Sequence, residues 1–375
     1  MEFLKTVYQE IIGFFSFHGL LEIVKSGDYG RMLTLDGIRA TLAPFIPVLL
    51  VIEIIRSLFY RKLTFSEYKV SFFTYVLNRF VSRFISIAAV AFCIGLFEPI
   101  ALFKTEFTWY WFIYGYVIWE FAHFVYHYLG HKVRLFWCLH STHHAPEYMN
   151  LSVTYAHFFL EAPYADVIRT SICILMGVNP PLLFLIMFVD GFWGSFIHIG
   201  EDVLKDGRLG PLNRIILTPS HHRVHHARNP LYMDTNFCNL LNIWDKVFGT
   251  FQPEREDVKI EYGITRPMKK NSFLDAYFGE IYCLAKDVYY APGLKNKLLY
   301  LIMPPGWSHT GEHKTAKVVR EEYLKQRGVS PAGEQQAVPA TETLAASHEG
   351  VASVADASSG DGVVTQPDTI QGNMA

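Results

Sequence analysis

Apolar runs separated by short polar stretches organise the first 200 residues of the chain. The first run long enough to cross a bilayer covers residues 40–60, because about 20 apolar residues are needed to cross the hydrocarbon core. Near its end, Glu53 and Arg56 lie one helical turn apart and are expected to pair. Further apolar segments follow at about 85–103, 107–126, 155–177 and 181–199. The last four segments make two hairpins, and the pattern predicts an all-α protein, a multi-pass transmembrane helical bundle of about four spans in two hairpins.

Basic residues between the first two apolar runs predict the sidedness of the chain. Loops rich in lysine and arginine stay on the cytoplasmic side of a membrane, and residues 61–83 carry Arg61, Lys62, Lys69, Arg79 and Arg83. Each hairpin of two spans returns the chain to its starting side. We therefore expect residues 127–144 and residues 222–226 to meet at the cytoplasmic membrane surface, as a cap on the bundle.

The composition supports a membrane protein. Hydrophobic residues make up 51% of the chain and aromatic residues 15%, whereas charged residues make up only 18%. Soluble domains have closer to a quarter charged residues. The net charge of −2 argues against nucleic acid as a partner. The five cysteines are scattered without a Cys-x-x-Cys pair, so neither a disulfide framework nor a thiolate metal site is indicated.

Three histidine motifs follow the predicted hairpins. They read His127-Tyr-Leu-Gly-His131, His140-Ser-Thr-His143-His144 and His222-Arg-Val-His225-His226. On a helix, residues three and four apart share a face, so each His-x-x-His-His motif is predicted to present three imidazoles on one face. A lone histidine is usually an ordinary surface or core residue, but two such motifs in one chain favour a metal site. Eight imidazoles can hold more than one metal, and imidazole suits iron, zinc, copper and nickel alike.

Histidine ligands normally donate their second N–H to a carboxylate or a carbonyl. Glu120 lies on the same helical face as His127 and is the first candidate for this role; Asp234 and Asp245 are others. Neutral imidazoles at the boundary of a membrane suit metal-based O₂ chemistry, in which the protein supplies geometry and a dry substrate channel.

The motifs resemble those of the sterol desaturase and fatty acid hydroxylase superfamily of integral-membrane di-iron enzymes. That superfamily is marked by one His-x-x-x-His box and two His-x-x-His-His boxes separated by a transmembrane hairpin. Trp137, three residues before His140, also fits. Residues 218–226 (Thr-Pro-Ser-His-His-Arg-Val-His-His), residues 244–251 (Trp-Asp-Lys-Val-Phe-Gly-Thr-Phe) and residues 304–307 (Pro-Pro-Gly-Trp) look most like the alkylglycerol monooxygenase-like branch. The resemblance covers roughly residues 40–310.

The resemblance implies that the eight box histidines bind two irons. His198 occupies the place of a further family histidine, and is either a ligand or a structural hydrogen-bonding group. His221 is expected beside the ligands or facing the substrate. His123 is a core histidine or an addition to the site, and His157 is structural.

The chain departs from the family pattern at two places. The acidic position before the first box, often Asp, is Glu120, and the usual Asn-Tyr-Gly after the third box reads Asn236-Phe237-Cys238. Neither change removes a ligand, but both alter contacts around the ligands. A fused heme-binding segment with a His-Pro-Gly-Gly motif is not visible. Electrons would therefore come from a separate donor or from a reduced pterin such as tetrahydrobiopterin, as the monooxygenase branch implies.

Four regions are predicted along the chain. Residues 1–39 form an amino-terminal interfacial or re-entrant segment, in which 25–39 reads as a loop. Residues 40–267 form the membrane-embedded, fatty acid hydroxylase-like catalytic domain, and residues 268–325 a cytoplasmic helical extension. Residues 326–375 lack aromatic side chains and are rich in Ala, Ser, Gly, Pro and Gln. Such a segment buries too little apolar surface to fold, and we expect it to be disordered.

Three functions are compatible with these features. The favoured one is a lipid hydroxylase or monooxygenase that inserts oxygen from O₂ into a C–H bond of an ether lipid, a fatty acyl chain or a sterol. A desaturase could use the same metal centre. A non-catalytic membrane zinc protein is disfavoured, since structural zinc sites normally have four ligands and often include cysteine. The host membrane would be the inner membrane of a bacterium or the endoplasmic reticulum of a eukaryote.

Overall fold

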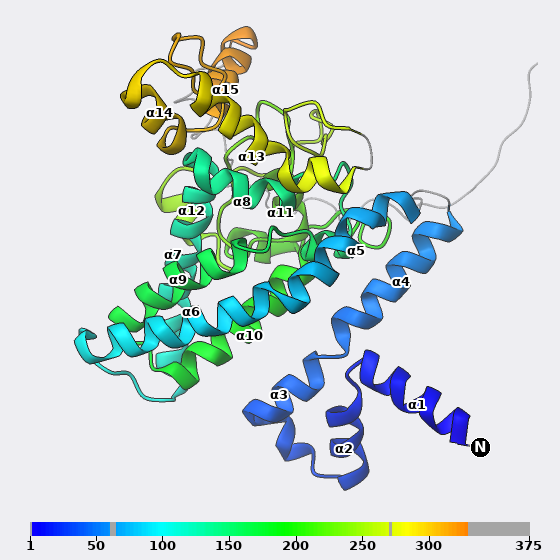
Figure 1. Cartoon of the computed structure of the whole chain (residues 1–375). Coiled ribbons are helices and arrows are strands. Elements are labelled where there is room, and N and C mark those ends of the chain that lie inside the picture. Colours follow the sequence, from blue (N-terminus) through cyan, green and yellow to red (C-terminus); the bar gives the residue numbers. More distant parts are fainter. Residues whose placement is uncertain (1, 61–64, 270–271, 329–375) are drawn as a thin grey trace, which may run out of the picture. The chain divides into compact units, whose positions relative to one another are not determined.

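The computed structural model describes residues 2–60, 65–269 and 272–328, and within these ranges the chain is helical. Loops connect the helices, and the β-pairing of the described part is limited to two isolated antiparallel bridges, Ile216–Leu241 and Ala227–Tyr262. Figure 1 traces the helices from α1 at the blue amino-terminal end to α15 in orange. The prediction of an all-α fold is therefore confirmed for the described residues.

Residues 2–60 form four α-helices and one 3₁₀ helix. They are α1 (Glu2–Phe14), α2 (His18–Ser26), η1 (Tyr29–Leu33), α3 (Leu35–Leu42) and α4 (Phe45–Phe59). The prediction of a loop over residues 25–39 is wrong. Gly27, with φ 68°, ends α2 in the left-handed conformation, and the Thr34 side chain accepts from the backbone N–H of Gly37 to cap α3. Here the polar residues and the glycine begin and end helices instead of forming a long loop.

Two helices in the described part of the chain are long and apolar enough to cross a membrane. They cover Asp36–Phe59 and Ser82–Ile100, and include α4 and α6 (Ser82–Phe97). α10 (Pro180–Phe196) is apolar but has 17 residues. The other predicted spans coincide with α7 (Trp109–Lys132) and α9 (Glu161–Leu175), which do not meet the same criteria. The predicted arrangement of about four spans is thus supported for two helices and otherwise stays a prediction.

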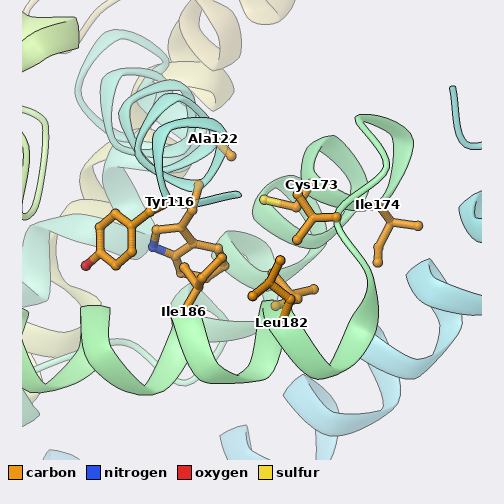
Figure 2. Packing of buried hydrophobic residues seen from close by; sticks show 9 residues of the cluster. Tyr116, Ala122, Cys173, Ile174, Leu182 and Ile186 are labelled. Carbon is orange, nitrogen blue, oxygen red and sulfur yellow. The ribbon is translucent and has the colours of Figure 1, made fainter. Parts of the chain in front are cut away.

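The helix that carries the first histidine motif, α7, is fixed by an apolar core. α7 packs against α9 and α10, and α6 lies along α9. Figure 2 shows Leu182 and Ile186 of α10 facing Tyr116 of α7 and Cys173 of α9. Ile186 and Leu183 are fully buried in this core. Because close-packed side chains resist displacement, the core fixes the carboxyl end of α7, which contains His127 and His131, and the end of α10, which His198 follows.

The remaining helices surround the histidine motifs on the other side of this core. α5 (Phe65–Phe80) precedes α6, and α8 (Arg134–His144) carries the second motif. The third motif lies on α11 (Pro219–His225), and α12 (Ile243–Val247) contacts α7. α13 (Phe273–Tyr290) and α14 (Gly293–Ile302) pack against α8, and Leu324 of α15 (Ala316–Gln326) packs near Tyr232. These three helices lie in the predicted extension 268–325, whereas the predicted disordered tail lies outside the described residues from 329 onward.

Candidate metal centre

The structure brings nine histidines together in two buried groups. The first group, His127, His131, His140, His144 and His225, and the second group, His143, His198, His222 and His226, each have their ligand atoms within 4.8 Å of one another. The groups are neighbours, since the imidazoles of His144 and His226 stack with their centroids 4.4 Å apart. All eight box histidines and His198 therefore lie where the sequence predicted a common site.

Each His-x-x-His-His motif divides its side chains between the two groups. His140 and His144 belong to the first group and His143 to the second; His222 and His226 belong to the second group and His225 to the first. The prediction that each motif presents three imidazoles on one face is wrong. In a helix of 3.6 residues per turn, consecutive residues point about 100° apart, so the i and i+4 members share a face and the i+3 member serves the other group.

Hydrogen bonds of the Nδ1 atoms determine the tautomers of two imidazoles in the first group, those of His127 and His140. The Nδ1 of His127 donates to the Phe237 carbonyl at 2.8 Å, and the Nδ1 of His140 donates to Glu161 at 2.5 Å. In these neutral tautomers the Nε2 atoms carry lone pairs. Yet the Nε2 of His140 lies 3.0 Å from the Nε2 of His127 and also 3.0 Å from the Nε2 of His144. Lone pairs at this distance repel each other unless a cation lies between them.

The second group has the same geometry. The Nδ1 of His198 donates to the Gly194 carbonyl at 2.6 Å, which leaves its Nε2 as an acceptor. That Nε2 lies 3.2 Å from the Nε2 of His143 and 2.9 Å from the Nε2 of His222, and the Nε2 of His226 lies 3.1 Å from that of His222. One hydrogen can satisfy only one of these contacts, whereas a central cation satisfies all of them.

These distances suit metal coordination. Imidazole nitrogens bind a metal such as zinc at about 2.1 Å, and two such ligands at right angles are about 3.0 Å apart. Among the described residues, the Nε2 atoms of His131 and His225 are buried without a hydrogen-bond partner. Orphaned buried nitrogens are rare in proteins, and both atoms belong to the first group. The residues present therefore fit bound metal ions.

Burial keeps the imidazoles in the form that binds metal. Burial lowers the pKa of His144, His225 and His226 well below the usual histidine value, and the neighbouring imidazoles lower it further. These side chains are therefore neutral at pH 7. Only neutral imidazole offers a lone pair to a metal.

Carbonyl and carboxylate groups orient the ligands, but they are only partly the ones the sequence predicted. Asp234 lies 3.4 Å from the Nδ1 of His131, as predicted for an orienting group. Burial opposes ionisation of Asp234, but His131 and Lys132 outweigh this effect and lower its pKa. Glu120, in contrast, accepts from the backbone N–H groups of residues 239, 240 and 241, so its predicted role in orienting His127 is wrong.

The loop of residues 235–237, after the third motif, orients His127 in place of Glu120. The Phe237 carbonyl accepts from His127, and the Thr235 carbonyl accepts from the Nδ1 of His225 at 2.8 Å. Asn236 between them has φ 57°, in the left-handed region that asparagine tolerates. Its side chain donates to the backbone carbonyls of His221 and Gln252. Asn236 thus supports the ligands through the loop and not by touching an imidazole.

Asp245 also acts on this loop. Its carboxylate accepts from the backbone N–H groups of Phe237 and Cys238 at 2.7 and 2.8 Å. The prediction that Asp245 orients a ligand directly is wrong, because the loop lies between Asp245 and His127. The carboxylate holds the Phe237 peptide, whose carbonyl in turn accepts from the ligand.

Three other histidines have roles that differ from one another. His221 caps α11, because its Nδ1 accepts from the backbone N–H of Thr218, and its ring packs on Phe251 outside the wall of the cavity described below, so the prediction that it contacts the ligands or faces the substrate is wrong. His157 stacks on His143 with centroids 4.2 Å apart and lines the cavity described below. His123 lines the same cavity, with its Nδ1 3.8 Å from Asp190. His123 is therefore part of the cavity wall.

Glu161 is a site residue that the sequence reasoning missed. One carboxylate oxygen accepts from His140, and the other accepts from the Nδ1 of His157 at 2.8 Å. The residue is 1% exposed, at the start of α9. A carboxylate four residues after a histidine, within an apolar segment, was the signal that could have identified it.

A cavity of about 470 Å³ touches both histidine groups. Its wall includes His127 and His140 of the first group and His143, His198 and His222 of the second. Tyr75 of α5, Ser82 of α6, and Gly191 and Gly194 of α10 complete other parts of the wall. Cavities of this size hold small molecules or part of a larger one, so a substrate segment placed here would lie beside the imidazoles of both groups.

Comparison with known proteins agrees with this site. Residues 112–250 match the model of the family described as fatty acid hydroxylase. The matched region includes all nine histidines of the two groups. The predicted resemblance to the sterol desaturase and fatty acid hydroxylase superfamily is confirmed.

Several curated relatives are oxygenases by name. Alkylglycerol monooxygenase of Homo sapiens is 31% identical over 236 residues, which cover 62% of this chain and 51% of the relative. The Caenorhabditis elegans protein of the same name is 36% identical over 200 residues, covering 50% of this chain and 38% of the relative. Ornithine lipid hydroxylase of Rhizobium tropici is 30% identical over 156 residues, which cover 42% of this chain and 46% of the relative. The chain thus spans about half the length of the relatives it matches, or less, and no solved structure matches it.

Proposed function

We propose that this chain, which resembles the fatty acid hydroxylase family over residues 112–250, is an integral-membrane di-iron oxygenase of lipids. It would use O₂ to insert one oxygen atom into a C–H bond of a lipid. The substrate would be an ether lipid, a fatty acyl chain or a sterol. The curated relatives support oxygen insertion because their names are monooxygenase and hydroxylase.

The observation that carries the proposal is the pair of buried imidazole groups that share one cavity wall. His127, His131, His140, His144 and His225 would hold one iron, and His143, His198, His222 and His226 would hold the other. Iron bound by these imidazoles supplies the activation of O₂. A purely structural zinc site is closed by four ligands, whereas nine histidines in two groups that both reach a cavity leave room for a reactant.

The chain's own residues shape the reaction site. The Glu161 carboxylate and the Phe237 carbonyl keep the Nε2 atoms of His140 and His127 directed inward, by accepting from their Nδ1 atoms. Gly191 and Gly194 form part of the cavity wall, and a Cβ atom on Gly191 would meet no atom within 4 Å, so glycine at position 191 leaves room for an apolar chain. The cavity would position a lipid C–H bond beside both groups and keep water away from it.

The membrane setting belongs to the same proposal. We place the histidine groups on the cytoplasmic side, in the inner membrane of a bacterium or the endoplasmic reticulum of a eukaryote. The two apolar helices Asp36–Phe59 and Ser82–Ile100 would anchor the chain in the bilayer. A separate electron donor or a reduced pterin would deliver the electrons that the insertion of one oxygen atom requires.

Metal removal and restoration test the proposal. The protein purified from membranes should contain about two irons per chain, because two imidazole groups of sufficient size are present. A chelator should abolish oxidation of added membrane lipids, and iron(II) with a reductant should restore it where zinc does not. Metal content and lipid products would be measured on the same samples. A chain that holds only zinc and oxidises no lipid after iron is supplied would contradict the proposal.

A further inference from the structure

Glu53 is a buried carboxylate on α4, far in sequence from the histidine motifs. It is 2% exposed, and it lies in the candidate span Asp36–Phe59. One carboxylate oxygen accepts from the backbone N–H of Leu151 at 2.6 Å, and the other accepts from the backbone N–H of Gly200 at 2.6 Å. The predicted pairing with Arg56 is wrong, because Arg56 donates to the Asp202 carbonyl. Burying a carboxylate in an apolar helix is costly, so its partners indicate a specific role.

Both amides that Glu53 accepts from belong to segments that flank the second histidine group. Gly200 comes two residues after His198, which is a member of that group. Leu151 begins the 3₁₀ helix η3 (Leu151–Tyr155), which follows the second motif. The Thr154 hydroxyl of this helix lies 3.2 Å from the Nδ1 of His198. The carboxylate therefore joins two segments that meet at one imidazole.

The packing around Gly200 shows how closely Glu53 approaches. A Cβ atom on Gly200 would lie 2.8 Å from the Glu53 Oε1 and 3.0 Å from the Met149 carbonyl oxygen. The first distance is shorter than real Cβ contacts allow. A side chain at this position would therefore displace the carboxylate from the backbone amides that it accepts from. Among the described residues, the hydrogen bonds of Glu53 lead to segments beside the second group and not to ligands of the first.

We propose that Glu53 is a positioning residue that sets the geometry of the group His143, His198, His222 and His226. It lies outside residues 112–250, so a helix beyond the family-matched region would complete the metal centre. The proposal rests on metal binding by this group and not on the identity of the substrate. Residues that orient ligands from outside typically change metal affinity by about 10–100-fold.

Metal stoichiometry in variants of the full chain tests this role. Glu53→Gln keeps one carbonyl oxygen and presents an amide N–H to the other backbone donor, so one of the two backbone amides loses its acceptor. We expect the second metal to bind about 10–100-fold more weakly while the first is retained. Gly200→Ala should have the same effect from the opposite side of the contact. After loading with iron(II) and oxidation, electron paramagnetic resonance should show an isolated ferric ion in place of a coupled pair.

Ser57→Ala is the matched control. Ser57 lies one turn along α4, is also 2% exposed, and has a hydroxyl that has no hydrogen-bond partner among the described residues. This variant should keep both metals. If Glu53→Gln still bound two metals tightly, or if Glu53→Gln and Ser57→Ala lost metal equally, the proposed role of Glu53 would be wrong. The proposed function would not be affected by either result. A wild-type chain that binds no metal would overturn this proposal together with the proposed function.

Discussion

Replacing His225 with alanine should abolish lipid oxidation and weaken metal binding at the first histidine group. Its Nδ1 donates to the Thr235 carbonyl, and its Nε2 is a buried nitrogen without a hydrogen-bond partner among the described residues. Alanine removes one of five imidazoles from that group. The His225 imidazole lies beside those of His127 and His144, with centroids 4.3 and 4.7 Å apart, so the substitution opens a gap in the ligand set. Metal analysis and product formation would be measured on the same purified protein.

His221→Ala is the control for this substitution. His221 lies four residues before His225 and is also buried, but it caps α11 through Thr218. Loss of a cap costs about 1 kcal/mol of stability, which should appear as a lower thermal midpoint with the metal content unchanged. If His221→Ala and His225→Ala lost metal and activity equally, histidine substitutions near α11 would act through folding, and the assignment of His225 as a ligand would be wrong.

Glu161→Gln should weaken metal binding at the first group by about 10–100-fold and lower product formation by a similar factor. The carboxylate accepts from His140 and from His157, and a glutamine amide can accept from only one of them. His140 would then lose the bond that keeps its Nε2 directed inward, or His157 would turn away from His143, on which it stacks. A metal titration of the metal-free protein measures this effect directly.

Glu120→Gln is the control for Glu161→Gln. It tests whether the loss of any buried carboxylate weakens metal binding, or only the loss of one that accepts from an imidazole. Glu120 is fully buried and accepts from three backbone N–H groups, but its oxygens contact no imidazole among the described residues. Loss of one of these bonds should cost about 1–3 kcal/mol of stability and leave the metal affinity as it was. A larger loss of metal in Glu120→Gln than in Glu161→Gln would reverse the roles assigned to the two carboxylates.

Much of the site could be predicted because spacing along a helix is a local property. The repeated His-x-x-His-His motif predicted which histidines come together, and the apolar segments between the motifs predicted helices. The same periodicity did not show that His143 and His144 serve different groups, although an angle of about 100° between consecutive residues requires it. A helix that lies between two groups presents different residues to each.

Contacts between distant segments could not be predicted from spacing. Glu120 shares a face of α7 with His127, yet both of its carboxylate oxygens accept hydrogen bonds from the backbone N–H groups of residues 239–241. The groups that orient His127 and His225 are backbone carbonyls, and any residue type supplies a carbonyl. Glu53 reaches Gly200 across 147 positions of the chain. Only the folded arrangement shows which carboxylate acts on which histidine.

The most direct test of the central claim uses isotopically labelled O₂ and membranes that contain the protein. Mass spectrometry would compare their lipids with those of membranes that contain the His225→Ala variant. We expect a lipid, or an aldehyde released from an ether lipid, that has gained one labelled oxygen atom only when the first histidine group is intact. A lipid that loses two hydrogens and gains no label would establish desaturation instead. Identical lipid profiles for the two proteins, with iron and reductant supplied, would contradict the proposal that this histidine centre oxidises lipids.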